Sequence, residues 1–450
     1  MSDAYDLIVI GAGMAGTSAA NKCAAQGWRV AIIDELPYGG TCALRGCDPK
    51  KILRRGAEII DAARLLDGDG IHDGETSIDW SDLVRRKRRF TERIPAALEE
   101  ELIGNNVATL HGQAQFVGRQ EVRIDDRVYT SKKFLVATGA RPRTLEFPGA
   151  EHVIDSTSFL DLDRLPKRIV FVGGGFISFE FAHIAARAGA ECIILDHGPR
   201  PLRGFDEELV RRLVRRSEQA GISVLRNTSV DRVEPRQAGF VVLVATDGTT
   251  STIDADLVVH GAGRVAALDD LDLEAAEVAY GSRGVTVADH LQSATNPAVF
   301  AAGDAADTAG RPLTPVAVFE GKVAASNMLR DTTTAPDYTG VPTTVFSIPE
   351  LNRVGLLEDE ARAQGFDVDV RFTDTSDWYS SYRVGETESA AKIVIDTATD
   401  MVLGAHLLGH GYSELINTFG MAMKLGLTTR QLKSVTATYP SLGSDLGSML

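Results

Sequence analysis

The stretch DLIVIGAGMAGTSAANKCAAQGWRVAIID, residues 6–34, contains the pattern that decides the fold. The apolar run LIVI leads into Gly11-x-Gly13, an alanine-rich segment follows, and a second apolar run ends at Asp34. This order predicts a strand, a helix and a second strand parallel to the first. The glycines permit a tight turn and let the backbone approach a pyrophosphate at the helix N-terminus. The Asp34 carboxylate is then placed to accept hydrogen bonds from a ribose.

The same pattern recurs in RIVFVGGGFISFEFAHIAARAGAECIILD, residues 168–196. Each copy has an apolar run, a Gly-x-Gly turn, an alanine-rich helical segment and a terminal acid, Asp34 or Asp196, at the same distance from its first glycine. One such turn is weak evidence, whereas two copies in register strongly indicate two βαβ units. Two dinucleotide sites in one chain indicate that electrons pass from a nicotinamide to a flavin. We therefore predict FAD at the first site and NAD(P)H at the second.

The composition is typical of a globular protein with several domains and an ample core. The chain has 450 residues, of which 44% are hydrophobic and 24% charged, and its formal net charge is −15. An acidic chain repels phosphate backbones, which argues against nucleic acid as a partner. Its apolar runs are too short for a membrane-spanning helix, and the N-terminus predicts a buried strand instead of a signal peptide.

The four cysteines are too few for a disulfide scaffold, so we expect a cytoplasmic protein in a reducing compartment. Cys23 and Cys192 fall in helical and strand patterns, where we expect small buried hydrophobes. The segment YGGTCALRGCDPKK, residues 38–51, instead places Cys42 and Cys47 five positions apart at a predicted helix start. Two thiols at this spacing can form and break a short disulfide, and beside a flavin they would act as a two-electron relay.

Two further strand patterns end in small polar motifs. Residues 129–142 contain Thr138-Gly139 after an apolar run, and residues 296–308 contain Gly303-Asp304, where the acid is placed to bind a sugar hydroxyl. After Asp337, short β-rich runs precede a helical stretch at residues 413–427, and this part has no glycine pattern. The C-terminal part therefore predicts a separate α+β unit.

Together these motifs resemble the pyridine nucleotide–disulfide oxidoreductases, in the branch of glutathione reductase, dihydrolipoamide dehydrogenase and mercuric reductase. The resemblance extends over nearly the whole chain, and its most specific motif is GGTC…GC…PKK. It implies an α/β fold with two Rossmann-like domains, for FAD and NAD(P), and a C-terminal α+β interface domain that forms a homodimer with a shared active site. The implied domains are residues 1–150 (FAD domain, first part), 151–265 (NAD(P) domain), 266–335 (central segment completing the FAD domain) and 336–450 (interface domain).

The resemblance assigns roles to individual residues. Cys47 would be the thiol that lies against the flavin, and Cys42 the thiol that attacks a substrate disulfide. Lys50 would lie near flavin N5 with Glu180 as its ion-pair partner, and this pair can stabilise an anionic reduced flavin. Phe176 would be an aromatic gate over the nicotinamide pocket. Surface positions for Lys50 and Glu180 are the alternative.

The resemblance also implies cofactor contacts at the glycine turns, strand ends and helix starts. Those for FAD are Gly11, Gly13, Met14, Ala15, Gly16, Asp34, Glu35, Gly40, Thr41, Lys50, Gln113, Ala114, Thr138, Gly139, Gly303, Asp304, Leu313, Thr314 and Pro315. Those for NAD(P) are Gly173, Gly175, Phe176, Ile177, Asp196, His197, Arg203 and Gly263. Because the sequence has no His/Cys cluster with ligand spacing, we predict no metal site.

The C-terminal sequence departs from the family pattern of His-Pro-Thr followed by Glu. Tyr439 stands where the proton-shuttling histidine would be and Ser444 where its glutamate would be, with Asp445 one step on. A phenol, with a pKa near about 10 against about 6.5 for histidine, is a poor proton relay at neutral pH. His406 and His410 are nearby in sequence, and we interpret them as packing or surface residues.

Three functions are compatible with this departure. The first is NAD(P)H-dependent reduction of a disulfide with an unusual small-molecule substrate, with Tyr439 in place of the usual histidine. The second is reduction of a metal ion or a quinone, although mercuric reductases need a terminal cysteine pair and no cysteine follows Cys192. The third is a flavin redox sensor or binding protein with little turnover, which the complete Cys42–Cys47 motif disfavours.

The second nucleotide site carries opposing signals for the choice between NADH and NADPH. Asp196 is positioned like Asp34, and an acid there accepts from a ribose 2′-OH and repels a 2′-phosphate, which favours NADH. His197, Arg200 and Arg203 follow closely, and basic residues in this loop hold the phosphate in NADPH-dependent relatives. On balance we predict NADH.

Overall fold

The computed structural model describes residues 4–72, 74 and 76–450, and the chain divides into two compact units. Unit 1 contains Met1–Lys51, Arg85–Arg143 and Arg264–Tyr338. Unit 2 contains Ile52–Val84, Thr144–Gly263 and Thr339–Leu450. Each unit therefore brings together three stretches that are separate in the sequence.

Unit 1 is built on a seven-stranded sheet in the order β3-β2-β1-β6-β5-β4, with β18 also paired to β6. The pairs among β1, β2, β3, β6 and β18 are parallel, and β4, β5 and β6 pair antiparallel. The strands are β1 (Ala4–Ile10), β2 (Val30–Asp34), β3 (Val107–His111), β4 (Ala114–Gly118), β5 (Glu121–Ile124), β6 (Arg127–Val136) and β18 (Val299–Ala301). Short strands complete the unit: β7 (Ala140–Pro142) with β15 (Arg264–Ala266), and β16 (Tyr280–Gly281), β17 (Gly284–Thr286) and β19 (Ala306–Asp307).

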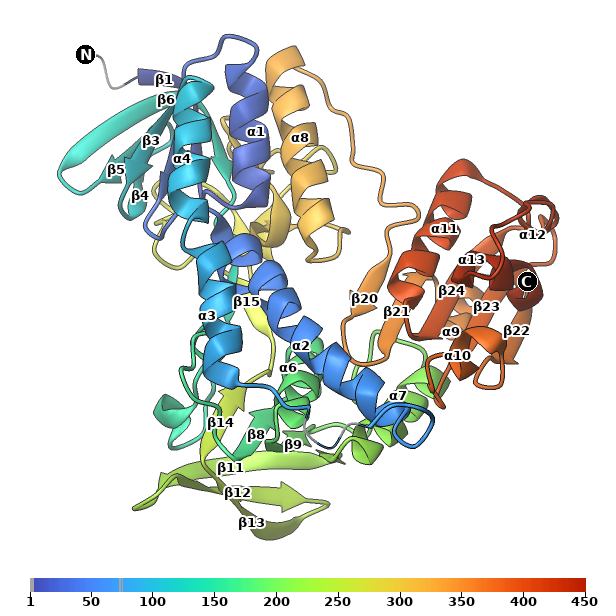
Figure 1. Ribbon diagram of the computed structural model, residues 1–450. Coiled ribbons are helices and arrows are strands. Elements are labelled where there is room, and N and C mark those ends of the chain that lie inside the picture. The colour runs from blue at the N-terminus through green and yellow to red at the C-terminus, as the bar shows by residue number, and fades with distance from the viewer. Residues whose placement is uncertain (1–3, 73, 75) are drawn as a thin grey trace. The chain divides into compact units, whose positions relative to one another are not determined.

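The helices of unit 1 cover one face of this sheet. Leu7 and Val9 of β1 pack in one core cluster with α1 and α8, while Ile8 and Ile10 pack in the core on the opposite face. A strand buried on both faces explains the uninterrupted apolar run of the sequence. Figure 1 shows α1 and α8 side by side. The helical segments are α1 (Met14–Ala24), η1 (Thr41–Arg45), α4 (Ile94–Gly104), η3 (Gly303–Ala305) and α8 (Thr314–Arg330), and α2 (Cys47–Leu65) and α3 (Trp80–Thr91) continue between the units.

Unit 2 contains a parallel sheet, β10-β9-β8-β14, an antiparallel sheet, β11-β12-β13, and a five-stranded antiparallel sheet, β20-β21-β24-β23-β22. The strands of the first two sheets are β8 (Arg168–Val172), β9 (Glu191–Leu195), β10 (Ile222–Leu225), β11 (Thr228–Pro235), β12 (Phe240–Thr246), β13 (Thr249–Ala255) and β14 (Leu257–His260). Those of the third are β20 (Thr343–Val345), β21 (Glu350–Gly355), β22 (Val368–Asp374), β23 (Ala390–Asp396) and β24 (Val402–Gly409). The helices are η2 (Ala150–His152), α5 (Ser156–Leu160), α6 (Phe176–Arg187), α7 (Glu207–Gln219), α9 (Glu358–Ala363), α10 (Tyr379–Tyr382), α11 (Tyr412–Leu425), α12 (Thr429–Lys433) and α13 (Leu442–Met449).

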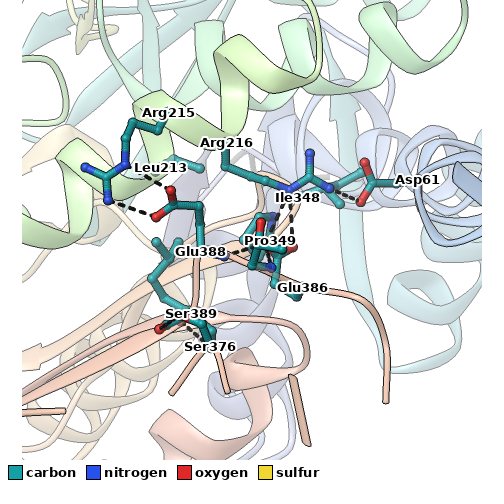
Figure 2. Close-up of polar contacts among 12 residues, drawn as sticks. Asp61, Leu213, Arg215, Arg216, Ile348, Pro349, Ser376, Glu386, Glu388 and Ser389 are labelled. Atoms are coloured by element: carbon teal, nitrogen blue, oxygen red, sulfur yellow. Dashed lines mark hydrogen bonds and ion pairs between the residues drawn. The ribbon is translucent and has the colours of Figure 1, made fainter. Parts of the chain in front are cut away.

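An ion-pair network, buried around Arg216 and exposed at Arg215, joins α7 to α2 and to the segment before β23. Arg216 contacts Asp61 at 2.8 Å and Glu386 at 3.3 Å, and Arg215 contacts Glu388 at 2.9 Å. Figure 2 shows Arg215 reaching Glu388 and Arg216 reaching Asp61. Removing one partner of a buried pair leaves an uncompensated charge, which costs about 3–5 kcal/mol. The network therefore ties distant parts of unit 2 into one fold.

The observed elements confirm the α/β fold that the sequence predicts. Both glycine turns lie in strand–turn–helix–strand units, β1-α1-β2 and β8-α6-β9, and a β-rich C-terminal part precedes α11. Within residues 4–72, 74 and 76–450, every helix is too short or too polar to cross a bilayer.

Candidate functional site

The first glycine turn brings three backbone segments into close contact. Gly11 has a φ of 108°, and a Cβ there would lie 2.3 Å from the Ala137 carbonyl oxygen. A Cβ on Gly16 would lie 2.0 Å from the Gly11 carbonyl oxygen. Gly13 precedes α1 and offers no side-chain cap, so the first N–H groups of the helix stay available to an anion.

The acid at the end of β2 lies beside this turn. Asp34 accepts hydrogen bonds from the N–H of Ala12 at 2.7 Å and of Leu36 at 2.9 Å. Burial raises the pKa of the Asp34 carboxyl, while these two hydrogen bonds act in the opposite direction. Glu35 and Gln113 are exposed nearby in the chain, and Ala114 is buried. The Gly112 N–H donates to the Asp34 carbonyl oxygen at 3.1 Å, which brings the Gln113 segment to the end of β2.

The two cysteines lie next to each other and beside the first glycine turn. Cys42 is in η1, and Cys47 is the first residue of α2. The pKa of Cys42 is raised, first by a hydrogen bond with the Cys47 thiol and then by burial. A Cβ on Gly40 would lie 2.6 Å from the Gly13 Cα, so only glycines let the cysteine segment approach the turn this closely.

Thr314 contacts the cysteine pair from the start of α8. Its hydroxyl lies 3.6 Å from the Cys47 sulfur, and a hydrogen bond from Thr314 acts to lower the pKa of Cys42. Leu313 precedes α8 without a side-chain cap, and Pro315 occupies the first turn. Two helix N-termini, of α2 and α8, therefore meet at the thiols, and helix N-termini favour thiolates.

Glu320 is a site residue that the sequence analysis missed. Its carboxylate accepts from the Gly303 N–H at 2.7 Å, the Thr308 hydroxyl at 2.8 Å and the Tyr338 hydroxyl at 2.6 Å, and it is 1% exposed. These contacts hold the turn that carries Asp304, whose pKa is raised by burial. An acid on the apolar face of the VAVFEGKVAA segment was the available signal, because a buried acid requires partners.

The second glycine turn in unit 2 repeats the geometry of the first with different residues. Gly173 has a φ of 107°, and a Cβ there would lie 2.6 Å from the Gly261 carbonyl oxygen. Gly175 precedes α6, again without a side-chain cap. A Cβ on Gly261 would lie 2.0 Å from the Ser178 hydroxyl oxygen. The small residue at this contact is therefore in the loop after β14, not in the helix. Gly263 continues that loop with a φ of 104°.

Asp196 lies beneath this second turn. Its Oδ1 accepts from the Gly198 N–H at 3.2 Å, and its Oδ2 is buried and has no hydrogen-bond partner among the described residues. At the exposed edge of this turn, Arg203 Nη2 lies 3.2 Å from His197 Nε2. The Leu202 N–H donates to the Gly174 carbonyl oxygen at 2.9 Å, which holds this basic loop against the turn.

Lys50 and Glu180 are both buried, so the alternative that they are surface residues is wrong. Lys50 is 8% exposed in unit 1, and Glu180 is 1% exposed in unit 2. Glu180 Oε1 accepts from the Phe346 N–H at 2.7 Å. Phe176, four residues earlier on α6, is 48% exposed, and Ile177 is half-buried.

The C-terminal segment contains the residues that the sequence analysis predicts in place of the family's histidine and glutamate. Tyr439 is 79% exposed. The Ser444 hydroxyl is engaged with the Ser441 carbonyl oxygen at 2.5 Å within the first turn of α13. The Asp445 Oδ2 is buried, and nothing in the described part of the chain hydrogen-bonds it.

The nearby histidines and the remaining cysteines behave as the sequence predicts. His406 is 1% exposed, its Nε2 lies 2.9 Å from the Leu356 carbonyl oxygen, and burial lowers its pKa to about 4. His410 is exposed. Burial raises the pKa of Cys23 and of Cys192 to about 12, which makes both thiols unreactive. A search of residues 4–72, 74 and 76–450 finds no group of three or more His, Cys, Asp or Glu side chains that could hold a metal ion.

Comparisons with known proteins match nearly the whole chain. Residues 5–321 match the family described as pyridine nucleotide-disulphide oxidoreductase, and residues 341–449 match its dimerisation domain. A glutathione reductase from Burkholderia cepacia is 32% identical and a dihydrolipoyl dehydrogenase from Bacillus subtilis 31% identical, covering 98% and 97% of this chain and 97% and 94% of those proteins. The structure of the HOCl-induced flavoprotein disulfide reductase RclA from Escherichia coli is 27% identical, covers 99% of each chain and has a TM-score of 0.89. Its Cu(II) complex is likewise 27% identical, covers 99% of this chain and 98% of that one, and has a TM-score of 0.87.

Proposed function

Because the chain belongs to the pyridine nucleotide–disulphide oxidoreductase family, we propose that Cys42 and Cys47 pass electrons from NAD(P)H to a small-molecule disulfide. As a member of this family the chain is an FAD-dependent enzyme that acts on sulfur groups. The observation that supports the proposed relay best is the contact between the two thiols, at the start of α2 and beside the first glycine turn.

The residues of both turns fit the two nucleotides. Thr138 Oγ1 is buried beside the first turn without a partner in the described ranges, and Asp196 Oδ2 is in the same condition beside the second. A bound nucleotide would supply hydroxyl and phosphate groups to such orphaned atoms and to the uncapped helices. FAD, when bound, would supply a two-electron carrier between NAD(P)H and the Cys42–Cys47 disulfide. The residues proposed to hold each nucleotide are those named for it from the sequence.

The proposed exchange uses the two thiols in sequence. The Cys42 thiolate attacks the substrate disulfide, forms a mixed disulfide and releases the first substrate thiolate. The Cys47 thiolate then attacks the Cys42 sulfur, which releases the second thiolate and restores the Cys42–Cys47 disulfide. The sum is oxidation of one NAD(P)H and reduction of one disulfide to two thiols, with one proton taken from solvent. Tyr439 is proposed to stand near the leaving thiolate in place of the family's histidine.

We propose for Lys50 and Glu180 the roles at the flavin that the resemblance implies. Each is buried within its own unit, which a surface residue would not be. Phe176 is proposed to gate the nicotinamide pocket, and it lies at the start of α6 with 48% of its surface exposed. We also propose the domain ranges 1–150, 151–265, 266–335 and 336–450, a cytoplasmic location and a homodimer formed through the dimerisation domain.

NADH is the proposed donor, because an Asp196 oxygen lacks a partner that a ribose hydroxyl could supply. The competing feature is the basic rim with His197 and Arg203. Asp196→Ser should weaken NADH binding and strengthen NADPH binding, roughly tenfold each, since a charge near a phosphate is removed. Calorimetric affinities for both nucleotides measure this, with Arg203→Ala as the matched variant on the same rim. Stronger NADPH than NADH binding by the wild type would contradict the choice.

An anaerobic titration with NADH tests the proposed relay. A long-wavelength band after two electrons would show that a thiolate lies against the flavin. Cys42→Ser cannot form the disulfide, so its free Cys47 thiolate should give the band before NADH is added, because Cys47 is the thiol proposed to lie against the flavin. Cys47→Ser should abolish the band. Bleaching of the flavin without the band in the wild type would contradict a coupled dithiol.

Reduction of Cu(II) is a second candidate function, because the RclA structure was also solved as a Cu(II) complex. For this chain Cu(II) would be an electron acceptor at the reduced thiols and not a resident metal. Formation of Cu(I) under anaerobic conditions, measured with a Cu(I)-selective chelator and compared with NADH oxidation, distinguishes the candidates. Disulfide turnover without Cu(II) turnover would exclude it.

A further inference from the structure

The segment Phe346–Ile348, between β20 and β21, has its backbone held by side chains. Glu180 Oε1 accepts from the Phe346 N–H at 2.7 Å. His183 Nδ1 accepts from the Ile348 N–H at 3.1 Å. Arg187 Nη2 donates to the Ile348 carbonyl oxygen at 3.3 Å. All of these residues belong to unit 2, and three of them lie on α6.

A second helix holds the other side of the same backbone. Arg54 of α2 donates from Nε to the Phe346 carbonyl oxygen at 2.9 Å and from Nη2 to the Ser347 carbonyl oxygen at 2.9 Å. An ion pair with Glu350 at 2.9 Å fixes the guanidinium. Arg54 is 5% exposed and Ser347 is 0% exposed, so water does not compete for these contacts.

The spacing along α6 explains why its side chains reach one segment. Glu180, His183 and Arg187 are three and four positions apart, which puts them on one face of a helix. Glu180 is the acid proposed to act at the flavin, whereas His183 and Arg187 have no role in the proposed chemistry. The same helix face therefore carries one residue of the proposed site and two that hold its backbone partner.

The hydrogen bonds of His183 determine its tautomer. Its Nε2 lies 2.9 Å from the Ser217 hydroxyl, which itself donates to the Leu213 carbonyl oxygen at 2.7 Å. Nε2 must therefore carry the proton, and Nδ1 must accept. Burial and the neighbouring Arg187, Arg216 and Arg54 hold the pKa of His183 well below its usual value, so the ring stays neutral. His183 is thus a fixed acceptor for the Ile348 N–H.

We propose that His183 and Arg54 are positioning residues for Glu180. By holding the Phe346–Ile348 backbone they present the Phe346 N–H to Glu180 Oε1 and fix the orientation of the carboxylate. One oxygen is engaged by the backbone, so the carboxylate plane cannot rotate freely towards other partners. A segment of the dimerisation domain therefore sets the geometry of an acid in the nucleotide-binding domain. The inference rests on the proposed role of Glu180 at the flavin.

Two substitutions of His183 separate positioning from simple packing. His183→Asn keeps an acceptor at the position of Nδ1 and loses the contact with Ser217. His183→Gln keeps a donor at the position of Nε2 and loses the acceptor for Ile348. Arg215→Ala, which removes a contact with Glu388 in the same unit, is the control for a lost polar contact without effect on Glu180. Glu180→Gln reports the effect of Glu180 itself.

The measurements use the FAD-loaded full chain. The flavin midpoint potential and the rate of flavin reduction by NADH report on Glu180. Amide hydrogen exchange at Ile348 reports, without any turnover, on the hydrogen bond from the Ile348 N–H to His183. We expect His183→Gln to slow flavin reduction about tenfold, because a misplaced group loses that much in orientation, and to shift the potential in the direction of Glu180→Gln. Exchange at Ile348 should become faster. His183→Asn should restore all three values towards the wild type.

The outcomes distinguish the inference from the function on which it rests. If Glu180→Gln changes the potential and His183→Gln matches Arg215→Ala, the positioning role is overturned while the role of Glu180 stands. If Glu180→Gln leaves the potential and the reduction rate unchanged, the proposed role of Glu180 fails and the inference falls with it. Faster exchange at Ile348 with unchanged flavin properties in His183→Gln would show a structural clamp only and would overturn the inference.

Discussion

Each of the two glycine turns has a contact that is too close for a side chain. The glycine that permits this contact lies in the helix of the first turn and in the loop of the second. In the first turn, Gly16 of α1 packs against the Gly11 carbonyl oxygen, and Ala137 follows the neighbouring strand β6. In the second turn the helix carries Ser178, and the equivalent of Ala137 is Gly261. The hydrogen bonds agree, since the Ala137 and Gly261 N–H groups donate at 2.8 Å to the last residues of β1 and β8. The first turn therefore has its closest contact between helix and turn, and the second has it between helix and loop.

The terminal acids of the two turns differ in the same way. Both Asp34 oxygens accept backbone hydrogen bonds, whereas Asp196 uses Oδ1 and leaves Oδ2 without a partner in the described ranges. Both carboxylate oxygens of the first acid are thus engaged, while the second acid retains an unengaged acceptor oxygen. Repeats that look alike in sequence can therefore be closed by different contacts, and variants can show which contacts matter.

Replacing Gly16 of the first turn by serine, the residue at the equivalent position of the second turn, should have the largest effect on stability. In Gly16→Ser the new Cβ would lie 2.0 Å from a backbone oxygen that cannot move away. We expect a loss of at least about 3 kcal/mol and failure to retain FAD. Flavin content and thermal unfolding measure this, with Ser178→Gly as the converse variant, which should keep its fold. A Gly16→Ser protein with full flavin content would show that the first turn tolerates a side chain.

As the pH falls, unit 2 should lose stability before unit 1 does. In the native state the pKa of His406 is lowered from 6.5 to about 4, so stability that is present above pH 6.5 is lost as the pH falls towards 4. The maximum loss is about 3 kcal/mol. In unit 1 burial raises the pKa of Asp34, Asp304 and Glu320, and such acids favour the folded state as the pH falls.

Amide hydrogen exchange at a series of pH values, corrected for its intrinsic pH dependence, measures this difference between the units. His406→Gln keeps a donor for the Leu356 carbonyl oxygen and removes the titrating group, so its unit 2 should lose less stability below pH 6.5. Earlier opening of unit 1, or an unchanged pH dependence in the variant, would contradict the assignment.

Adding a side chain at Gly261 of the second turn should reduce stability by an intermediate amount. A second substitution, at Ser178, should recover most of that loss. Gly261→Ala would place a Cβ 2.0 Å from the Ser178 hydroxyl oxygen and should cost about 1–3 kcal/mol. Combining it with Ser178→Ala removes the clashing oxygen and should recover most of the loss. Denaturant unfolding of both single variants and the double variant gives the coupling between the two positions. Additive effects would show that Ser178 is not the obstacle.

The smallest expected effect is a gain in stability from Ser178→Ala alone. The Ser178 hydroxyl is buried with no hydrogen-bond partner in the part of the chain that the structure describes, and such a group costs about 1 kcal/mol or more. The matched change in the first turn is Thr17→Val, because Thr17 donates to the Gly13 carbonyl oxygen at 2.9 Å. That change should destabilise by a similar amount. A change of the unfolding temperature in the same direction for Ser178→Ala and Thr17→Val would contradict this account.

Local pattern in the sequence was sufficient to identify both βαβ units, their glycine turns, the cysteine pair and the buried character of Cys23 and Cys192. These features depend on the period of apolar residues, on the backbone freedom of glycine and on short spacings, all of which are local. The resemblance to a family supplied long-range expectations, such as Lys50 with Glu180, which stay predictions. It could not supply the contacts that are particular to this chain.

Only the tertiary structure showed which distant groups meet. Glu320 holds the Gly303 turn, Thr314 contacts the thiols, and Phe346 donates to Glu180 across 166 positions. Neither partner of such a contact has a distinctive local pattern, because a hydrogen bond depends on where two segments pack and not on the spacing within either. The sequence alone also did not show that Gly16 of the helix permits the close contact in the first turn and Gly261 of the loop permits it in the second. Steric fit depends on how two segments pack against each other.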